Sequence, residues 1–168
     1  MTFEEYIPLA METAVFKDPL YPYASLLVES AELLDVFVKP LLRGDNGGVV
    51  DRDKVIKEAG DCLWNLAAIC KSHGFIPPAD SSDVVLRPSV EEALQICLGI
   101  VGHARNIVRV QSAASWPVEE TMVSSVLYRV TAVLIAVNST LDEALDANLA
   151  KLRSRAERGV LLGSGGER

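Results

Sequence analysis

Three signals for the start of a helix recur along this chain. In each, a Ser or Thr is followed three residues later by Glu, just before a segment rich in apolar residues. They are Thr2 with Glu5, Ser89 with Glu92, and Thr140 with Glu143. In such a capping box the hydroxyl and the carboxylate accept hydrogen bonds from backbone N–H groups that a helix start leaves free. No segment alternates apolar and polar residues as a half-buried strand does. The pattern predicts an all-α protein.

Proline, aspartate and glycine residues set the expected limits of the helices. Pro8 should kink or shorten the first helix, and Pro40 should close the second. Asp51 or Asp53 can cap the third, which should end where Gly74 can adopt a left-handed backbone. After a short first helix, the expected helices span residues 24–39, 54–72, 90–112, 118–137 and 141–155. Short connections between long amphipathic helices favour an antiparallel helical bundle, and the length fits a single domain over residues 1–168.

The charge balance argues against some classes of partner. The chain has 23 acidic and 16 basic residues, which gives a net charge of −7. Because nucleic acids are held largely by Lys and Arg, we expect no nucleic acid polymer as a partner. The chain starts without a basic and apolar leader, and its most apolar stretch, Val130–Val137, is far shorter than the roughly 20 residues that span a bilayer. We therefore expect a cytoplasmic protein with no membrane partner.

Cysteine and histidine offer little for metal or nucleophile chemistry. The three cysteines, Cys62, Cys70 and Cys97, include no Cys-x-x-Cys pair and are expected to be buried thiols. The two histidines, His73 and His103, are too far apart in sequence for a His-x-x-x-His metal pair. The glycine patterns of phosphate loops and Rossmann folds do not occur in the sequence either. The carboxylates remain as the chemically distinctive residues.

Two pairs of acidic residues lie on helix faces that a bundle should bury. Glu29 and Glu32 are three residues apart on one expected helix. Glu58 and Asp61 have the same spacing on the next, so each pair has neighbouring side chains that border apolar residues on a helical wheel. Two unit charges about 5.5 Å apart repel by about 3 kcal/mol at an effective dielectric constant of about 20. A cation should therefore lie among them, and oxygen ligands without His or thiolate favour Mg²⁺, or Mn²⁺, over zinc.

The acidic pairs also resemble the signature of a known family. The Glu-x-x-Glu … Glu-x-x-Asp signature of MazG-like nucleoside triphosphate pyrophosphohydrolases is similar to two segments, Leu27-Val-Glu-Ser-Ala-Glu-Leu-Leu34 and Lys57-Glu-Ala-Gly-Asp-Cys-Leu-Trp-Asn-Leu-Ala67. The segment from Asn148 to Gly159 is similar to the one with which many MazG-like chains end. Together the matches cover roughly residues 22–72 and 140–166. The resemblance implies the all-α fold of these pyrophosphohydrolases.

The resemblance implies a reaction and a role for each of the four acids. A nucleoside triphosphate, or its deoxy form, would be cleaved between its α and β phosphates to give the monophosphate and pyrophosphate. Mg²⁺ would be held by Glu29, Glu32, Glu58 and Asp61. The metal would neutralise phosphate oxygens and lower the pKa of the attacking water, and either Glu58 or Glu29 would orient that water or accept its proton.

Other polar residues are candidates for binding the substrate. Asn65 lies one turn after the second acidic pair and can bond the sugar or phosphate, or cap a buried gap. Lys39 and Lys54 can meet a phosphate or pair with nearby acids, and simple pairing is slightly favoured for Lys39. Three basic residues of the C-terminal segment 140–168 can close over the polyphosphate or complement the end of a helix. They are Lys151, Arg155 and Arg158.

The middle of the chain departs from the compact family pattern, because short members pass almost directly from the Glu-x-x-Asp helix to the terminal segment. We predict that residues 90–137 form a degenerate second helix pair, which packs against the metal-binding pair over 22–72 within one chain. In this alignment Ile100 and His103 take the positions of the first two acids. Two unrelated amphipathic helices would align about as well. By analogy with the family we also expect a homo-oligomer, most simply a dimer.

Two other functions fit the same residues. The acids could bind a cation in a non-catalytic helical interaction module that the metal only stabilises. The chain could also be a phosphoribosyl-ATP pyrophosphohydrolase, which shares the fold and the metal, although the C-terminal segment is more similar to that of MazG-like chains. No single residue indicates which base or sugar is recognised.

Overall fold

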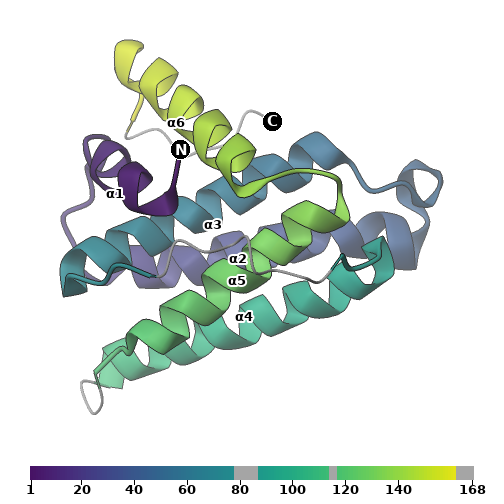
Figure 1. Ribbon diagram of the computed structural model, residues 1–168, viewed down its shortest axis with the longest axis horizontal. Helices are drawn as coiled ribbons and strands as arrows, with labels where there is room; N and C mark the ends of the chain where they lie inside the picture. The colour runs from purple at the N-terminus through teal and green to yellow at the C-terminus, as the bar shows by residue number, and fades with distance from the viewer. Residues whose placement is uncertain (78–86, 114–116, 162–168) are drawn as a thin grey trace.

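Six α-helices and one short 3₁₀ helix make up the described part of the computed structural model, residues 1–77, 87–113 and 117–161 (Figure 1). They are α1 (Phe3–Met11), α2 (Tyr21–Arg43), η1 (Asp45–Gly48), α3 (Arg52–His73), α4 (Val90–Ala113), α5 (Glu120–Ala136) and α6 (Leu141–Glu157). No strand occurs within these residues, so the predicted all-α class is confirmed. The end of the predicted C-terminal segment, residues 162–168, lies outside the described part.

Two of the predicted capping boxes are complete. At the start of α1, Thr2 N donates to Glu5 Oε2 at 2.8 Å, and Glu5 N donates to Thr2 Oγ1 at 3.2 Å. Ser89 and Glu92 form the same reciprocal pair at the start of α4, with distances of 2.7 and 3.2 Å. These bonds satisfy backbone donors that would otherwise be free, which explains why both helices begin where the sequence predicts.

The third capping box is only half formed. Thr140 Oγ1 accepts a hydrogen bond from Glu143 N at 3.2 Å, as predicted. The Glu143 carboxylate does not return the bond, because it pairs with the guanidinium of Arg52 and accepts a hydrogen bond from Ser139 Oγ at 2.7 Å. Since Arg52 begins α3, this contact ties the start of α6 to the start of α3.

Both prolines that were expected to limit a helix lie inside one. α1 continues past Pro8 but is short and ends at Met11, whereas α2 continues past Pro40 to Arg43, so the limit predicted at Pro40 is too early. A proline removes one backbone hydrogen bond and crowds the preceding turn, but each of these lies close to the end of its helix, where little is lost. α2 ends at Gly44, whose φ of 79° is the left-handed conformation that favours glycine.

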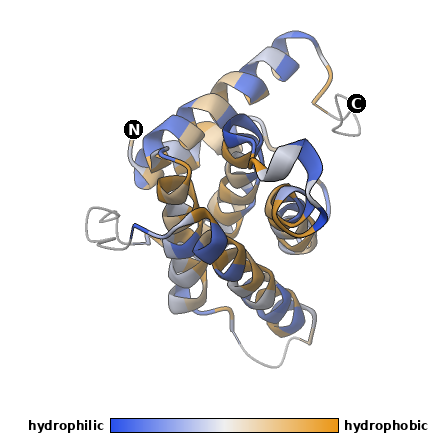
Figure 2. Cartoon of the chain, turned by 90° about the vertical axis from the view of Figure 1, so that its right-hand side faces the viewer, coloured by the Kyte–Doolittle hydropathy of each residue, from blue (hydrophilic) through white to orange (hydrophobic). Residues whose placement is uncertain are grey.

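Four helices enclose the core, and the two others lie across one side of it (Figure 1). α2 contacts α3 and α4, while α5 contacts α4 and α3. α6 packs on α3, and α1 contacts both α3 and α6. Figure 2 shows that the helices carry both hydrophobic and hydrophilic residues, as amphipathic helices do. α3, which carries the second acidic pair, therefore contacts both other helices that bear candidate residues, α2 and α6.

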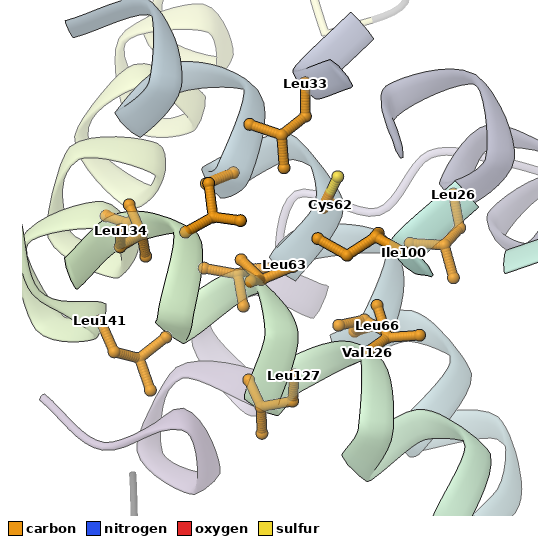
Figure 3. Close-up of a cluster of buried hydrophobic side chains, with 14 of the residues drawn as sticks. Leu26, Leu33, Cys62, Leu63, Leu66, Ile100, Val126, Leu127, Leu134 and Leu141 are labelled. Atoms are coloured by element: carbon orange, nitrogen blue, oxygen red, sulfur yellow. The ribbon is translucent and has the colours of Figure 1, made fainter. Parts of the chain in front are cut away.

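The core is built from aliphatic and aromatic side chains to which all six α-helices contribute. Figure 3 shows Leu26 and Leu33 of α2 near Leu63 and Leu66 of α3 and Ile100 of α4, and all five are fully buried. Burying one such side chain contributes about 1.5–3 kcal/mol. The three cysteines are buried and free, as predicted. This packing holds α2 against α3 and so determines how their polar side chains meet.

Within the described residues, no single helix is both long and apolar enough to cross a bilayer. α5 and α6 satisfy the two criteria only when taken together, and they are bent by 98° relative to each other.

Candidate metal centre

Three carboxylates from two helices converge at one point. α2 supplies Glu29 and Glu32, one turn apart, and the neighbouring α3 supplies Glu58. One oxygen of each lies within 4.8 Å of an oxygen of the other two. Glu58 is buried, Glu29 is half-buried and Glu32 is exposed, so the group opens to solvent on the Glu32 side. These three residues are termed the acidic cluster below.

The fourth predicted ligand, Asp61, lies outside the acidic cluster. It follows Glu58 by one turn of α3, but its carboxylate forms an ion pair with Lys151 of α6. The same carboxylate oxygen accepts a hydrogen bond from Asn148 Nδ2 at 3.0 Å. Two donors from α6 thus hold Asp61 toward that helix. The spacing of the acids in the sequence could not show that α6 crosses α3 at this point.

Burial and like charge act together on Glu29. Burial is the main cause that raises the pKa of Glu29 from 4.5 to about 7, and the negative charges of Asp61, Glu32 and Glu58 raise it further. The ammonium group of Lys151 acts in the opposite sense. The neighbouring carboxylates therefore disfavour a negative charge on Glu29, and a divalent cation there would relieve the repulsion.

The raised pKa of Glu29 gives a testable pH dependence of stability. The folded protein holds this proton more tightly than the unfolded chain, so without divalent ions the stabilising contribution is complete below about pH 4.5 and lost as pH rises through about 7. Urea denaturation in EDTA should show this decline for the wild type and a smaller decline for Glu29→Gln, which has no carboxyl group to ionise. Identical pH profiles for the two proteins would show that the pKa of Glu29 is not shifted.

The Glu58 side chain has one buried oxygen without a partner. Only 8% of the residue is exposed, and Glu58 Oε1 accepts a hydrogen bond from Lys57 Nζ at 2.8 Å. Glu58 Oε2 finds no hydrogen-bond partner among the residues that the structure describes. Leaving a buried acceptor without a donor costs about 1–3 kcal/mol, and more when the group is charged. A cation beside this oxygen would therefore be stabilising.

Asn65 lies two turns after Glu58 on the same face of α3. It is 2% exposed, and its Nδ2 donates to the backbone carbonyl of Asp61 at 2.9 Å. Its Oδ1 is buried and has no hydrogen-bond partner in the described part of the chain. With this burial, Asn65 fits the predicted role of a polar group in a buried gap better than direct contact with a substrate.

Two of the predicted substrate-binding lysines are paired elsewhere. Lys39 forms an ion pair with Asp35, one turn earlier on α2. Lys54 Nζ lies 3.6 Å from a carboxylate oxygen of Asp51, the residue that caps α3. Both lysine side chains are at least half exposed, so these pairs are worth little in stability. Neither pair involves the acidic cluster.

The three basic residues of the C-terminal segment have different surroundings. Lys151 forms an ion pair with Asp61, one of the four acids. Arg155 follows it by one turn of α6 and is half-buried. Arg158 lies just past the end of α6, where its Nε donates to the carbonyl of Ser154 at 3.2 Å. Arg158 thus complements a helix end, which was one of its two predicted roles.

Four residues near the acids were not singled out from the sequence. Lys57 pairs with Glu58, as described above. Tyr6 is fully buried, burial raises the pKa of its phenol, and its hydroxyl donates to Asn148 Oδ1 at 2.7 Å. Gly60 lets α6 approach, since a Cβ there would lie 2.9 Å from Asn148 Cβ. A glycine inside a helix indicates such a contact, whereas Tyr6 and Asn148 carry no local signal.

A pocket of about 280 Å³ lies between α3 and α6, beside the acids. It is lined by Asp53, Ile56, Lys57, Glu143, Ala147, Asn148 and Lys151, and is termed the α3–α6 pocket. Lys57 and Lys151 line this pocket and also pair with Glu58 and Asp61. These two lysines therefore connect the pocket to the acidic region, and their charge at the pocket wall is balanced by that of Asp53 and Glu143.

Comparison with known proteins adds no assignment, since no protein-family model, curated protein or solved structure matches this chain. The MazG-like resemblance thus rests on the acidic pairs and the C-terminal segment.

Proposed function

We propose that this protein is a Mg²⁺-dependent, MazG-like nucleoside triphosphate pyrophosphohydrolase that acts in the cytoplasm, with Mn²⁺ able to replace Mg²⁺. The observation that carries the proposal is the buried Oε2 of Glu58, which has no hydrogen-bond partner among the described residues and belongs to a group of three carboxylates. The proposed reaction is hydrolysis of a nucleoside triphosphate, or its deoxy form, between the α and β phosphates. Its products are the nucleoside monophosphate and pyrophosphate.

The chemistry of the acidic cluster fits Mg²⁺. All three side chains offer carboxylate oxygens, which are the ligands that hard cations prefer. Mg²⁺ keeps several waters and is usually bound by one or two carboxylates together with substrate phosphates. The exposed position of Glu32 leaves one side of the cluster open to a polyphosphate. A site of this kind suits a metal–nucleotide complex better than a closed structural metal.

Each residue then has a proposed role. Bound Mg²⁺ would supply positive charge to the phosphate oxygens and lower the pKa of a water molecule. Glu29, Glu32 and Glu58 hold the ion, and Glu29 or Glu58 accepts the proton of the attacking water. Glu29 is the stronger candidate for this base, because Lys57 already occupies one oxygen of Glu58. Glu29 takes part in no ion pair within the described chain.

The fold supports a related proposal about α4 and α5. These helices contact each other and pack against α2 and α3 within the chain. We propose that they are a degenerate copy of the metal-binding pair in an antiparallel, MazG-like bundle, with Ile100 and His103 in place of the first two acids. Failure of the two pairs to superpose would end this idea. The proposal includes a homodimer, which light scattering would detect as twice the chain mass of 18.2 kDa.

A nucleotide panel tests the activity. The protein is incubated with Mg²⁺ and each common ribo- and deoxyribonucleoside triphosphate, and released pyrophosphate is measured. We expect pyrophosphate and the monophosphate in equal amounts from at least one nucleotide, with no release in EDTA and recovery with Mn²⁺. Release of inorganic phosphate instead would contradict cleavage between the α and β phosphates.

The same experiment separates the two alternatives. A non-catalytic metal-stabilised module would turn over no nucleotide, while Mg²⁺ would still raise its melting temperature. A phosphoribosyl-ATP pyrophosphohydrolase would cleave phosphoribosyl-ATP in preference to every triphosphate in the panel. A protein whose melting temperature does not respond to Mg²⁺ or Mn²⁺ would have no metal site of the proposed kind.

A further inference from the structure

The middle of the α4–α5 pair is free of acidic residues, although the chain as a whole is acidic. None of the 23 acidic residues lies in segments 93–118 or 121–141. The same segments contain one histidine and three arginines, namely His103, Arg105, Arg109 and Arg129. α4 and α5 lie side by side (Figure 1), so this part of a chain with a net charge of −7 is locally positive. Positive charge of this kind attracts anions.

Arg129 of α5 lies against the backbone of α4 at Gly99. A Cβ at position 99 would lie 2.9 Å from Arg129 Nη1 and 3.3 Å from Arg129 Cζ, so the missing side chain of Gly99 makes room for the guanidinium in this position. Arg129 is half-buried and takes part in no ion pair within the described residues. A guanidinium carries five N–H donors in one plane, and those of Arg129 are thus not bound to any carboxylate of the described chain.

His103 and Gly102 follow Gly99 by one turn of α4. Residues three and four positions apart on a helix are surface neighbours, so both border Gly99. His103 is half-buried, burial lowers the pKa of its imidazole, and the charge of Arg129 lowers this pKa further, so at pH 7 the neutral ring has one N–H to donate. Gly102 is exposed, and a Cβ there would meet no described atom within 4 Å. The surface beside Gly102 is therefore open to a ligand.

We propose that Arg129 and His103 form a binding site for a phosphate group where α5 contacts α4, outside the acidic cluster. The guanidinium of Arg129 donates two parallel hydrogen bonds to two phosphate oxygens, and the imidazole of His103 donates one to a third oxygen. A carboxylate has only two oxygens, which the guanidinium would occupy, so the second donor group favours phosphate. Binding needs no divalent ion, so this site is independent of the metal site proposed above.

Titration of inorganic phosphate in EDTA tests the site. We expect a Kd of about 1 mM or lower, the affinity that a few charge-assisted hydrogen bonds provide. In isotope-labelled protein the amide signals of Gly99 and Gly102 should shift during the titration, and acetate at the same ionic strength should bind more weakly. A nucleoside monophosphate is titrated in parallel. Tighter binding of the monophosphate with the same shifts would identify a nucleotide as the source of the phosphate group, and equal or weaker binding would identify the free ion.

Arg129→Gln should lower the affinity for phosphate by about tenfold or more, because two charge-assisted hydrogen bonds are lost. Arg129→Lys keeps the charge but not the planar pair of donors, so its affinity should fall between those of the wild type and Arg129→Gln. His103→Phe keeps an aromatic ring without the N–H and should lower the affinity about threefold. Arg153→Gln is the matched control, since Arg153 is an exposed arginine on α6 and should not affect phosphate binding.

Two results would overturn the phosphate site. One is a wild-type protein whose Gly99 and Gly102 signals do not move when phosphate is added. The other is wild-type affinity in the folded Arg129→Gln or Arg129→Lys protein, which would place the anion elsewhere. If Arg129→Gln does not fold, Arg129→Lys and the wild-type shifts still decide. Release of pyrophosphate in the nucleotide panel requires Mg²⁺ and is expected whatever these titrations in EDTA give.

Discussion

Glu58→Gln should abolish the Mg²⁺-dependent release of pyrophosphate while leaving the helical fold intact. The substitution removes the carboxylate that carries the unpartnered buried oxygen, and with it one charge of the metal ligand set. Loss of a metal ligand or of a catalytic base typically lowers turnover by about 10²–10⁴-fold, so we expect a loss of about 10³-fold or more. Pyrophosphate release from the best nucleotide of the panel measures the effect. The rise in melting temperature with Mg²⁺ should also be lost.

Glu91→Gln makes the same chemical change away from the acids. Glu91 is an exposed residue in the first turn of α4, and an exposed substitution of this kind should change stability by no more than about 0.5 kcal/mol. Its turnover should therefore match the wild type. If Glu58→Gln kept wild-type turnover and a wild-type response to Mg²⁺, the acidic cluster would not be the metal site.

Gly60→Ala should destabilise the protein and weaken the contact between α3 and α6. A Cβ at position 60 would lie 2.9 Å from Asn148 Cβ and 3.4 Å from the carbonyl oxygen of Ala144. Neither atom is at the flexible end of a side chain, so the backbone of α6 has to move. Overpacking of this kind costs about 1–3 kcal/mol, which urea denaturation would detect as a lower free energy of unfolding. Because Asn148 also binds Asp61, turnover should fall as well.

Gly102→Ala is the control for the intrinsic effect of alanine in a helix. Gly102 is exposed on α4, and an added Cβ would meet no described atom within 4 Å. Alanine should there raise the free energy of unfolding by about 0.5–1 kcal/mol, because it loses less backbone freedom than glycine on folding. If Gly60→Ala and Gly102→Ala raised the free energy of unfolding by similar amounts, the close approach of α6 to α3 would not depend on the absence of a side chain at Gly60.

Helix limits could be predicted where they depend on residues within one turn. Asp51 caps α3 by accepting hydrogen bonds from the N–H groups of Asp53 and Lys54, and Gly74 ends the same helix with a φ of 71°. Ser89 and Glu92 likewise need only each other. The limit expected at Pro40 is wrong because Pro40 lies within one turn of the end of α2, where the loss of one backbone hydrogen bond costs little.

The contacts of the candidate site could likewise be predicted where they join helices that are consecutive in the sequence, and could not be predicted where they join distant ones. The meeting of Glu29, Glu32 and Glu58 depends on two helices that are consecutive in the sequence, and their polar residues on apolar faces indicated a shared site. The partner of Asp61 could not be predicted, because Lys151 lies 90 positions away and its approach depends on how α6 crosses α3. Gly60, which allows that crossing, was visible as a glycine within a helix but had no predicted neighbour.

The hydrogen bond from Tyr6 to Asn148 joins positions 142 residues apart, and this separation affects how the chain matures. A nascent chain leaves the ribosome N-terminus first, at about 5–20 residues per second. Until Asn148 and Lys151 have emerged, Asp61 lacks both of its donors, although the whole of α2 and α3 has already been synthesised. During these seconds water and dissolved cations have to take the place of the two α6 donors at the Asp61 carboxylate.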